Sequence, residues 1–172
     1  DLGFMTLGRL LESVSGRSLD DFVRAEIYAP LGLSRTGFLP RARAATADGP
    51  FAATSHGNPF ERRMVHDPDF GYRIEGDADA WDEWREYTLA GEVNDGNAHH
   101  AFGGIAGHAG LFAPAAELHA ILGLMMGGGV GPDGSRLLGG ETVGRFLVST
   151  GDGQALGWQL PGYAPEGSFG HT

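Results

Sequence analysis

The stretch SFGHT, residues 168–172, sets an imidazole beside a hydroxyl after a strand-like approach. Histidine changes its charge near neutral pH, and a threonine hydroxyl can donate a hydrogen bond to a carbonyl or carboxylate group. The edge of an acyl-transfer site would use such side chains to hold a substrate. We therefore take His171 and Thr172 as candidate catalytic residues; the alternative is a solvated pair at a strand end.

A nucleophile to accompany this edge is missing from the sequence. There is no Gly-x-Ser-x-Gly motif, and Ser15 in VSGRS falls at a predicted helix end, where serine is commonly a terminator. All twelve basic residues are arginine, which excludes a Schiff-base lysine, a phosphate-loop lysine and a Ser-x-x-Lys nucleophile within these residues. We expect the chain alone to be catalytically silent, because no complete set of nucleophile and base is present.

Seven histidines raise the hypothesis of a metal-dependent hydrolase. The closest group is His99, His100 and His108, but its spacing fits neither a structural zinc site nor a helical His pair with a glutamate. The acidic run at 77–88 lacks the glycine and the glutamate that a calcium loop needs. With no cysteine for thiolate ligands, we expect no metal and no cofactor. No local signal singles out a carboxylate pair for glycoside hydrolysis, although 22 acids leave one open.

Composition limits the partners. The formal net charge is −10, and binding to nucleic acid needs clusters of basic side chains, so we expect no nucleic-acid partner. No apolar run approaches the ~20 residues of a membrane-spanning helix, so we expect no span in this segment. A chain of 172 residues with 41% hydrophobic side chains can bury the core of one domain. Its 30 glycines indicate many turns and close backbone contacts.

Residues 1–40 are expected to form a helical hairpin. The first helix should end at Gly16, which suits a left-handed C-cap, and the second should begin after Ser18, a good N-cap. Pro30 should end the second helix, because proline disfavours helical geometry in the residue before it. The apolar residues at helical spacing are Leu7, Leu10, Leu11 and Val14 in the first helix, and Leu19, Phe22, Val23 and Ile27 in the second.

Residues 41–90 are expected to form an irregular insertion, without sustained periodicity up to residue 75. In the acidic segment 75–87, Trp81, Trp84 and Tyr87 recur three residues apart, which favours a short helix with one aromatic face. That face could simply pack, or Trp81 and Trp84 could line a substrate cleft. The second interpretation allows a non-catalytic module that binds peptidoglycan-like or other glycopeptide ligands.

Residues 91–150 should hold a glycine-dense loop at 101–112 and two helices. The first should start at Pro114 and stop at the glycines 127–129, and the second should cover residues 141–148. Residues 151–172 should form two strands, 156–160 and 167–170, joined by a turn and leading to the His-Thr pair. The residues expected to face inward are Leu118, Ile121, Leu122 and Met125 in the first helix, and Val143, Phe146 and Leu147 in the second.

Several spaced motifs occur in an order that resembles the serine β-lactamase-like family, which includes class C β-lactamases, DD-peptidases and related esterases. The first forty residues, with VSG and PLG-x-x-x-T-x-F, resemble the stretch after that family's Tyr-Ser-Asn or Tyr-Ser-Asp triplet. The segment GEVNDGNAHHAFGGIAGHAGLF is similar to the branch with V-H-D-x-N-A and G-H-A-G-L-F. LGWQL followed by FGHT is similar to the approach to a Lys-Thr-Gly or His-Thr-Gly strand.

The resemblance implies an α/β (α+β) β-lactamase/transpeptidase-like fold, of which residues 1–172 would be one incomplete domain. This part would be mainly the helical region with one or two sheet strands. It further implies a parent enzyme, a serine hydrolase that cleaves an ester, amide or lactam through an acyl-serine intermediate without a metal. The Ser-x-x-Lys pair and the tyrosine base would lie before residue 1, so both chain ends are expected to be cuts.

The resemblance also assigns roles. Asp1 matches the third triplet position, where a polar side chain contacts substrate; the alternative is a helix N-cap, and Asp1 could serve as both. His171 and Thr172 match the first two residues of the third motif. The glycine loop, with Gly107, His108 and Gly110, would border the substrate; His108 would either line the cleft or hold the loop by a hydrogen bond.

Two departures from the family pattern are visible. Asn94 stands where the V-H-D motif has histidine, and Ala113-Pro114-Ala115 replaces a Ser-Thr helix cap. The resemblance implies a small-molecule or peptidoglycan-like ester, amide or lactam substrate, and it implies that the protein is located in the bacterial cell envelope or outside the cytoplasm. The sequence by itself leaves a cytoplasmic location and the oligomeric state open.

Overall fold

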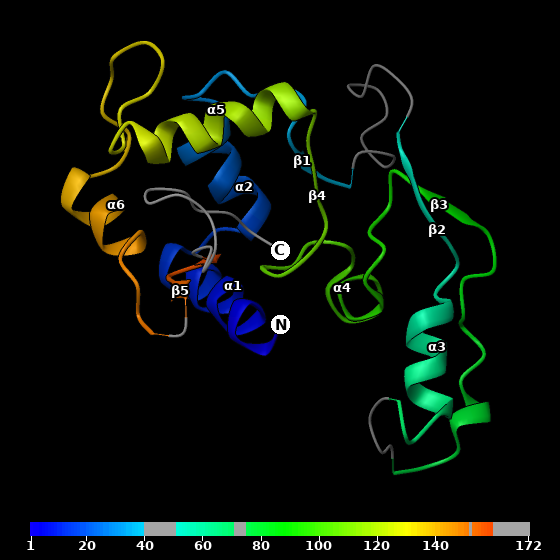
Figure 1. Cartoon of the computed structure of the whole chain (residues 1–172). Helices are drawn as coiled ribbons and strands as arrows, with labels where there is room; N and C mark the ends of the chain where they lie inside the picture. Colours follow the sequence, from blue (N-terminus) through cyan, green and yellow to red (C-terminus); the bar gives the residue numbers. More distant parts are fainter. Residues whose placement is uncertain (40–50, 71–74, 152, 160–172) are drawn as a thin grey trace. The chain divides into compact units, whose positions relative to one another are not determined.

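The computed structural model describes residues 1–39, 51–70, 75–151 and 153–159, and the chain divides into two compact units. One unit holds residues 1–29 and 33–114, and the other holds residues 30–32 and those from 115 onward. Both contain helices and short antiparallel strands (Figure 1). The mixed α/β class predicted from the sequence is therefore confirmed.

The N-terminal helices have the caps that the sequence predicts. Helix α1 (Leu2–Ser15) ends at Gly16, which has φ 67° and donates its N–H to the carbonyl oxygen of Glu12 at 2.9 Å. Helix α2 (Leu19–Val23) follows Ser18, whose hydroxyl accepts the Asp21 N–H at 3.2 Å. It continues as one π-helical segment, η1 (Arg24–Tyr28). These ends form where expected because capping depends on residues close in sequence.

Part of the predicted irregular insertion is regular, so that expectation was wrong for residues 53–66. Strand β2 (Ala53–His56) pairs antiparallel with β3 (Thr88–Ala90), and helix α3 (Pro59–His66) begins directly after β2. A register shift separates the pairs Ala53–Ala90 and His56–Thr88. Each strand pairs with residues more than thirty positions away in sequence, so the local spacing of apolar residues does not predict the pairing.

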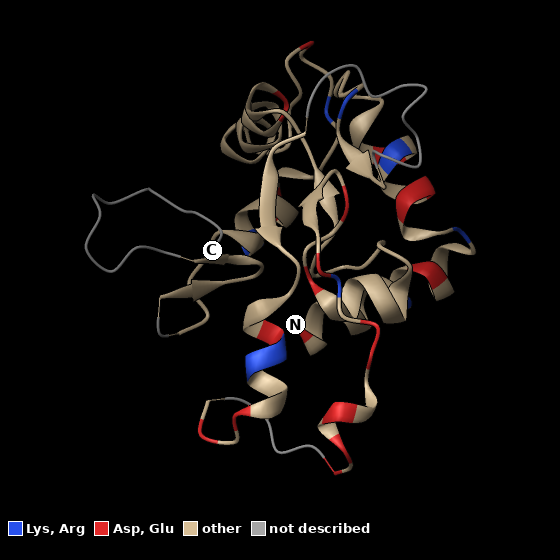
Figure 2. Cartoon of the chain, turned by 90° about the vertical axis from the view of Figure 1, so that its right-hand side faces the viewer, with Lys and Arg blue, Asp and Glu red and all other residues tan. Residues whose placement is uncertain are grey.

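The predicted helix with one aromatic face is also wrong. A 3-10 turn, η2 (Ala78–Ala80), is all that forms, because the Asp77 side chain accepts the Asp79 N–H at 3.0 Å in a local turn. Trp81 then adopts extended geometry with φ −89° and ψ 114°. Figure 2 shows the acidic residues, in red, that follow one another along this part of the chain beside α3.

The core of the first unit lies under helix α4 (Gly96–Phe102) and the loop that follows it. Gly103 ends α4 with φ 60°, and the loop leads to strand β4 (Leu111–Phe112), which pairs antiparallel with β1 (Gly37–Phe38). The buried residues of this core are Val93, Ala98 and Ala106, with Phe102 and Ala109 packed against them.

The second unit contains helix α5 (Ala115–Met126), helix α6 (Gly140–Phe146) and a hairpin of β5 (Gln154–Ala155) and β6 (Trp158–Gln159). Strand β6 falls within the predicted strand 156–160. The predicted strand 167–170 lies outside the described residues. Among the helices that the structure describes, none has the length and apolar character to cross a membrane.

The inward stripes predicted for these two helices are only partly right. On α5, Leu118 and Leu122 are exposed, while Leu124 and Met125 are buried. The predicted inward residue Ile121 is partly buried. After the helix the chain folds back through Gly127–Gly129, and the Gly129 N–H donates to the Leu124 carbonyl. On α6, Val143 is buried but Phe146 is exposed.

Tyr28, at the end of η1, provides a test of how tightly the N-terminal helices pack. Burial raises the pKa of its hydroxyl to about 12, and the negative charge of Asp20 adds to the shift. Asp20 is itself buried and accepts a hydrogen bond from Arg24 Nη2 at 2.8 Å. Deprotonation of Tyr28 is therefore unfavourable in the folded chain.

Because the folded pKa of Tyr28 is the higher one, its contribution to stability is complete below pH 10 and is lost as the pH rises to about 12. We expect Tyr28→Phe to remove this alkaline loss, which amounts to up to about 3 kcal/mol at 1.36 kcal/mol per pKa unit. Urea denaturation of both chains at pH 8 and pH 11.5 measures it. The exposed Tyr87→Phe is the control; an equal alkaline loss in wild type and Tyr28→Phe would contradict the prediction.

Candidate functional site

A buried arginine fixes the turn between β3 and α4. Arg85 is 6% exposed, and its Nε donates to Asn58 Oδ1 at 2.9 Å. Its Nη1 and Nη2 donate to the carbonyl oxygens of Val93 and Asn94, each at 2.6 Å. Among the described residues, no carboxylate lies within ion-pair distance of this guanidinium. The desolvation cost of the cation is thus offset by charge-assisted hydrogen bonds to neutral oxygens.

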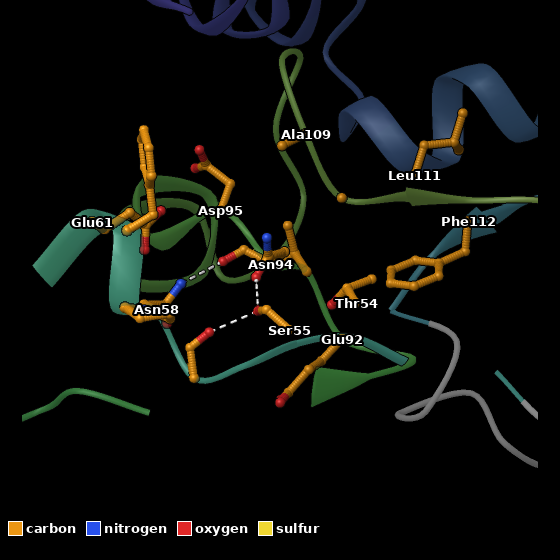
Figure 3. Close-up of a pocket in the computed structure, with 15 residues that line it drawn as sticks. Thr54, Ser55, Asn58, Glu61, Glu92, Asn94, Asp95, Ala109, Leu111 and Phe112 are labelled. Carbon is orange, nitrogen blue, oxygen red and sulfur yellow. Dashed lines mark hydrogen bonds between the residues drawn. The ribbon is translucent and has the colours of Figure 1, made fainter. Parts of the chain in front are cut away.

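The side chain of Asn58, at the start of α3, strengthens the same turn. Its Nδ2 donates to the Asn94 carbonyl oxygen at 2.8 Å, so that oxygen accepts from two donors (Figure 3). Ser55 Oγ lies 2.6 Å from Asn94 Oδ1 and 2.7 Å from the Gly57 carbonyl oxygen. The turn is therefore held by Arg85, which lies 8 and 9 positions away in sequence, and by Asn58 and Ser55, which lie 36 and 39 positions away.

Two carboxylates then hold the first turn of α4. Glu61 of α3 accepts the Gly96 N–H at 2.6 Å, and Asp95 Oδ1 accepts the Ala98 N–H at 2.7 Å as an N-cap. The first N–H groups of a helix have no partner within the helix, and the positive end of its dipole favours acids there. Helix α4 thus starts at a position set by α3.

His108 connects this turn to the glycine loop. Its Nε2 lies 3.0 Å from Asp95 Oδ1, and its side chain is only 2% exposed. The ring meets Phe102 edge-on at 6.0 Å between centroids, and Nδ1 is buried without a hydrogen-bond partner. This geometry is that of a residue that holds the loop, which the sequence analysis gave as one of two roles. Contact of His108 with a ligand stays a prediction.

The glycine loop contacts the backbone of α1 directly. A Cβ added at Gly107 would collide with the carbonyl oxygen of Phe4, so only glycine allows this approach. Gly110 has φ 105°, and a Cβ there would collide with the Gly104 carbonyl oxygen. The loop therefore lies against the first turns of the helix that Asp1 precedes.

Asp1 stands at the N-cap position of α1 but makes no capping hydrogen bond, and it is exposed. Its carboxylate is open to solvent near the end of α1 that the glycine loop contacts. His171 and Thr172 lie outside the described residues. The substrate-contact roles of Asp1, Gly107 and Gly110 remain predictions.

A cavity of about 530 Å³ opens on the other side of the same loop (Figure 3). Its lining comes from β2, the start of α3, the turn at 92–95 and the chain at 109–112. Gly110 lines it, whereas Gly107, His108, Trp81 and Trp84 do not. The loop thus has one side against α1 and its C-terminal end in the cavity wall.

The aromatic residues proposed as a binding platform point to separate partners. Trp81 meets His100 edge-on at 5.1 Å between centroids, Trp84 lies 6.3 Å from His66, and the Tyr87 hydroxyl donates to Glu92 at 3.2 Å. The rings share no helical face, and the substrate-binding roles of Trp81 and Trp84 stay predictions.

The surroundings of His99, in α4, lower its pKa. Burial lowers the pKa of His99, and the positive charges of Arg85 and His100 lower it further. Glu92 acts in the opposite direction, and its Oε1 is buried without a hydrogen-bond partner among the described residues. No three His, Asp or Glu side chains in the described part of the chain are placed to hold one metal ion.

The sequence analysis missed Arg85, Asn58, Glu61 and Ser55. Arg85 sits in the acidic run WDEWREY, where it reads as a solvated charge. The one local signal available was Asp95, which precedes α4 in an N-cap position. Ser55 and Glu61 lie on β2 and α3, which the sequence pattern did not predict.

The role of Arg85 can be measured by substitution. We expect Arg85→Met to lower the free energy of unfolding by about 3 kcal/mol, because the buried Val93 carbonyl and Asn58 Oδ1 lose their donor and the Asn94 carbonyl loses one of its two donors. Arg85→Lys should lose less, since an ammonium group can still donate to some of them. Urea denaturation provides the values. Arg62→Met is the matched control: Arg62 pairs with Glu86 on the surface, and its loss should cost under about 0.5 kcal/mol.

The close approach of the loop to α1 gives a second measurement. We expect Gly107→Ala to lower stability by about 1–3 kcal/mol, because its methyl group must displace backbone rather than a flexible side chain. Gly3→Ala on α1 meets nothing within 4 Å and should be neutral or slightly stabilising. Equal urea midpoints for the Gly107 and Gly3 variants would show that the contact is absent in solution.

The chain is similar to known bacterial proteins. A family model described as Beta-lactamase matches residues 1–172. A protein from Escherichia coli (strain K12) named "Putative D-alanyl-D-alanine carboxypeptidase" is 33% identical over 166 residues, which cover 95% of this chain and 35% of that protein. A protein of the same name from Salmonella typhi is 32% identical over equal shares. None of the solved structures matches significantly.

The chain therefore spans 35% of the length of the curated relatives it matches. The family model, by contrast, covers every residue of the chain. This agrees with the order of motifs noted in the sequence, so the predicted resemblance is confirmed. The chain belongs to the beta-lactamase family.

Proposed function

We propose that residues 1–172 are part of a serine hydrolase that cleaves an ester, amide or lactam bond, in peptidoglycan-like substrates among others, through an acyl-serine intermediate. The observation that carries this proposal is the match of the family model to the whole chain. The relatives named D-alanyl-D-alanine carboxypeptidase favour a peptide-like amide as the bond that is cleaved.

The reaction class sets what the site must supply. A serine oxygen attacks the substrate carbonyl carbon, its proton passes to a base, and the leaving amine or alcohol departs with a proton. Water then attacks the acyl-serine ester and releases the acid. The present sequence has no lysine, so a Ser-x-x-Lys nucleophile cannot be formed from these residues.

We assign these residues the substrate-facing support of that site. Asp1 is free of capping bonds and exposed, which leaves its carboxylate able to contact a substrate amide. The glycine loop packs on the first turns of α1 and is held from behind by the bond between His108 and Asp95. His171 and Thr172 are assigned the opposite edge, on the resemblance alone.

The experiment uses a polypeptide that carries residues 1–172 together with the Ser-x-x-Lys segment of its own reading frame. We expect a fluorescent penicillin to label it covalently, with one acyl group per chain by mass spectrometry, and the serine-to-alanine variant to remain unlabelled. Residues 1–172 alone should remain unlabelled. Labelling that survives the serine substitution, or a folded joined polypeptide that never acylates, would overturn the proposal.

The role of Asp1 is tested in the same polypeptide. Asp1→Ala should slow acylation about tenfold or more, the loss expected when one hydrogen bond to the reacting substrate is removed. Asp82→Ala, an exposed acid outside the cavity lining, is the matched control and should leave the rate unchanged. Equal acylation rates for the two variants would contradict a contact between Asp1 and the substrate.

A further inference from the structure

Gly110 apart, the residues that line the cavity beside the Asn94–Asp95 turn have no role in the reaction proposed above. Its volume of about 530 Å³ lies in the range of sites that bind small ligands. Phe60, Val93, Leu111 and Phe112 supply apolar lining, and Ala109 adds a small apolar side chain. Phe112 is fixed from behind by the ring of Phe51, edge-on at 6.3 Å between centroids. A wall of this kind suits a short apolar side chain of a ligand.

The side-chain amide of Asn94 lines the cavity, and its oxygen is held by Ser55. Asn94 Oδ1 lies 2.6 Å from Ser55 Oγ, and its Nδ2 points away from Ser55 (Figure 3). Asn94 Nδ2 has no hydrogen-bond partner among the described residues. The backbone carbonyl of Asn94 accepts hydrogen bonds from Arg85 and Asn58, which hold the residue that carries this amide. An N–H donor held in this way can bind a carbonyl oxygen.

The charges around the cavity exclude one class of ligand. Glu61, Glu92 and Asp95 line it, and no basic side chain is among its lining residues. The cation nearest to this turn, Arg85, is buried and directs its donors to the carbonyls of Val93 and Asn94. A carboxylate or phosphate would therefore meet like charges without a compensating cation.

We propose that this cavity binds an uncharged ligand that combines a carbonyl group with a short apolar side chain, as an acylated amino-acid amide does. Asn94 Nδ2 donates to the ligand carbonyl oxygen, and Phe112 and Val93 contact its apolar side chain. This inference goes beyond the proposed function because it requires no catalysis. Binding can be measured on residues 1–172 without a nucleophile, so its failure is distinct from failure of the hydrolase proposal.

The first test compares two probes of nearly the same shape on the wild-type chain. N-acetyl-alanine methylamide is neutral, whereas N-acetyl-alanine carries a carboxylate at pH 7. We expect the neutral probe to shift the side-chain amide resonances of Asn94 in nitrogen-15-labelled protein, with the millimolar affinity usual for a ligand of this size. The carboxylate should bind about tenfold more weakly, and salt should narrow the difference. Equal affinity, or no shift with the neutral probe, overturns the proposal.

The second test removes each contact separately. Asn94→Asp keeps the shape but replaces the donor with an acid, and Phe112→Ala shortens the apolar wall; each should weaken binding of the neutral probe about tenfold. Gln154→Leu and Phe146→Ala, an exposed amide and an exposed ring of the second unit, are the matched controls. Unchanged affinity in both cavity variants would overturn the proposal, and the probe comparison stands if either variant fails to fold.

Discussion

A guanidinium that is 6% exposed must satisfy its N–H donors inside the protein, and Arg85 does so with three neutral oxygens. Two of them are consecutive backbone carbonyls, Val93 and Asn94, so the cation sets the direction of the chain where it leaves β3 and enters α4. Hydrogen bonds from a charged donor are about twice as strong as neutral ones. This buried charge holds the turn at Val93 and Asn94, while Glu61 and Asp95 hold the start of α4.

Asp95 links the start of α4 to the glycine loop. One of its oxygens accepts both the Ala98 N–H and the hydrogen bond of His108, so the helix start and the loop share a single acceptor. The loop can then approach α1 because Gly107 has no Cβ to meet the Phe4 carbonyl. Asp95, which directly follows the turn held by Arg85, is therefore linked through His108 to the loop that lies against the helix beginning after Asp1.

Features determined by neighbouring residues could be predicted from the sequence, and those determined by distant ones could not. Gly16 and Ser18 cap their helices as expected because a cap involves residues within four positions. The pairing of β2 with β3 spans more than thirty residues, and the Asp95–His108 bond spans a whole helix and turn. Trp81 and Trp84 have helical spacing, yet each packs on a different histidine, and tertiary contacts override the local pattern.

The same reasoning explains why an asparagine is compatible with position 94. Its main-chain carbonyl accepts from Arg85 and Asn58, and these two hydrogen bonds do not depend on which side chain the residue carries; the side-chain oxygen adds the contact with Ser55 Oγ. The side chain is then available to determine the chemistry of the cavity. Histidine, which the family motif has here, would bring a group that can become positively charged among three acids. Asparagine keeps a hydrogen-bond donor without that charge, so the proposed preference for a neutral ligand follows from the uncharged donor at position 94 together with the three acids that line the cavity.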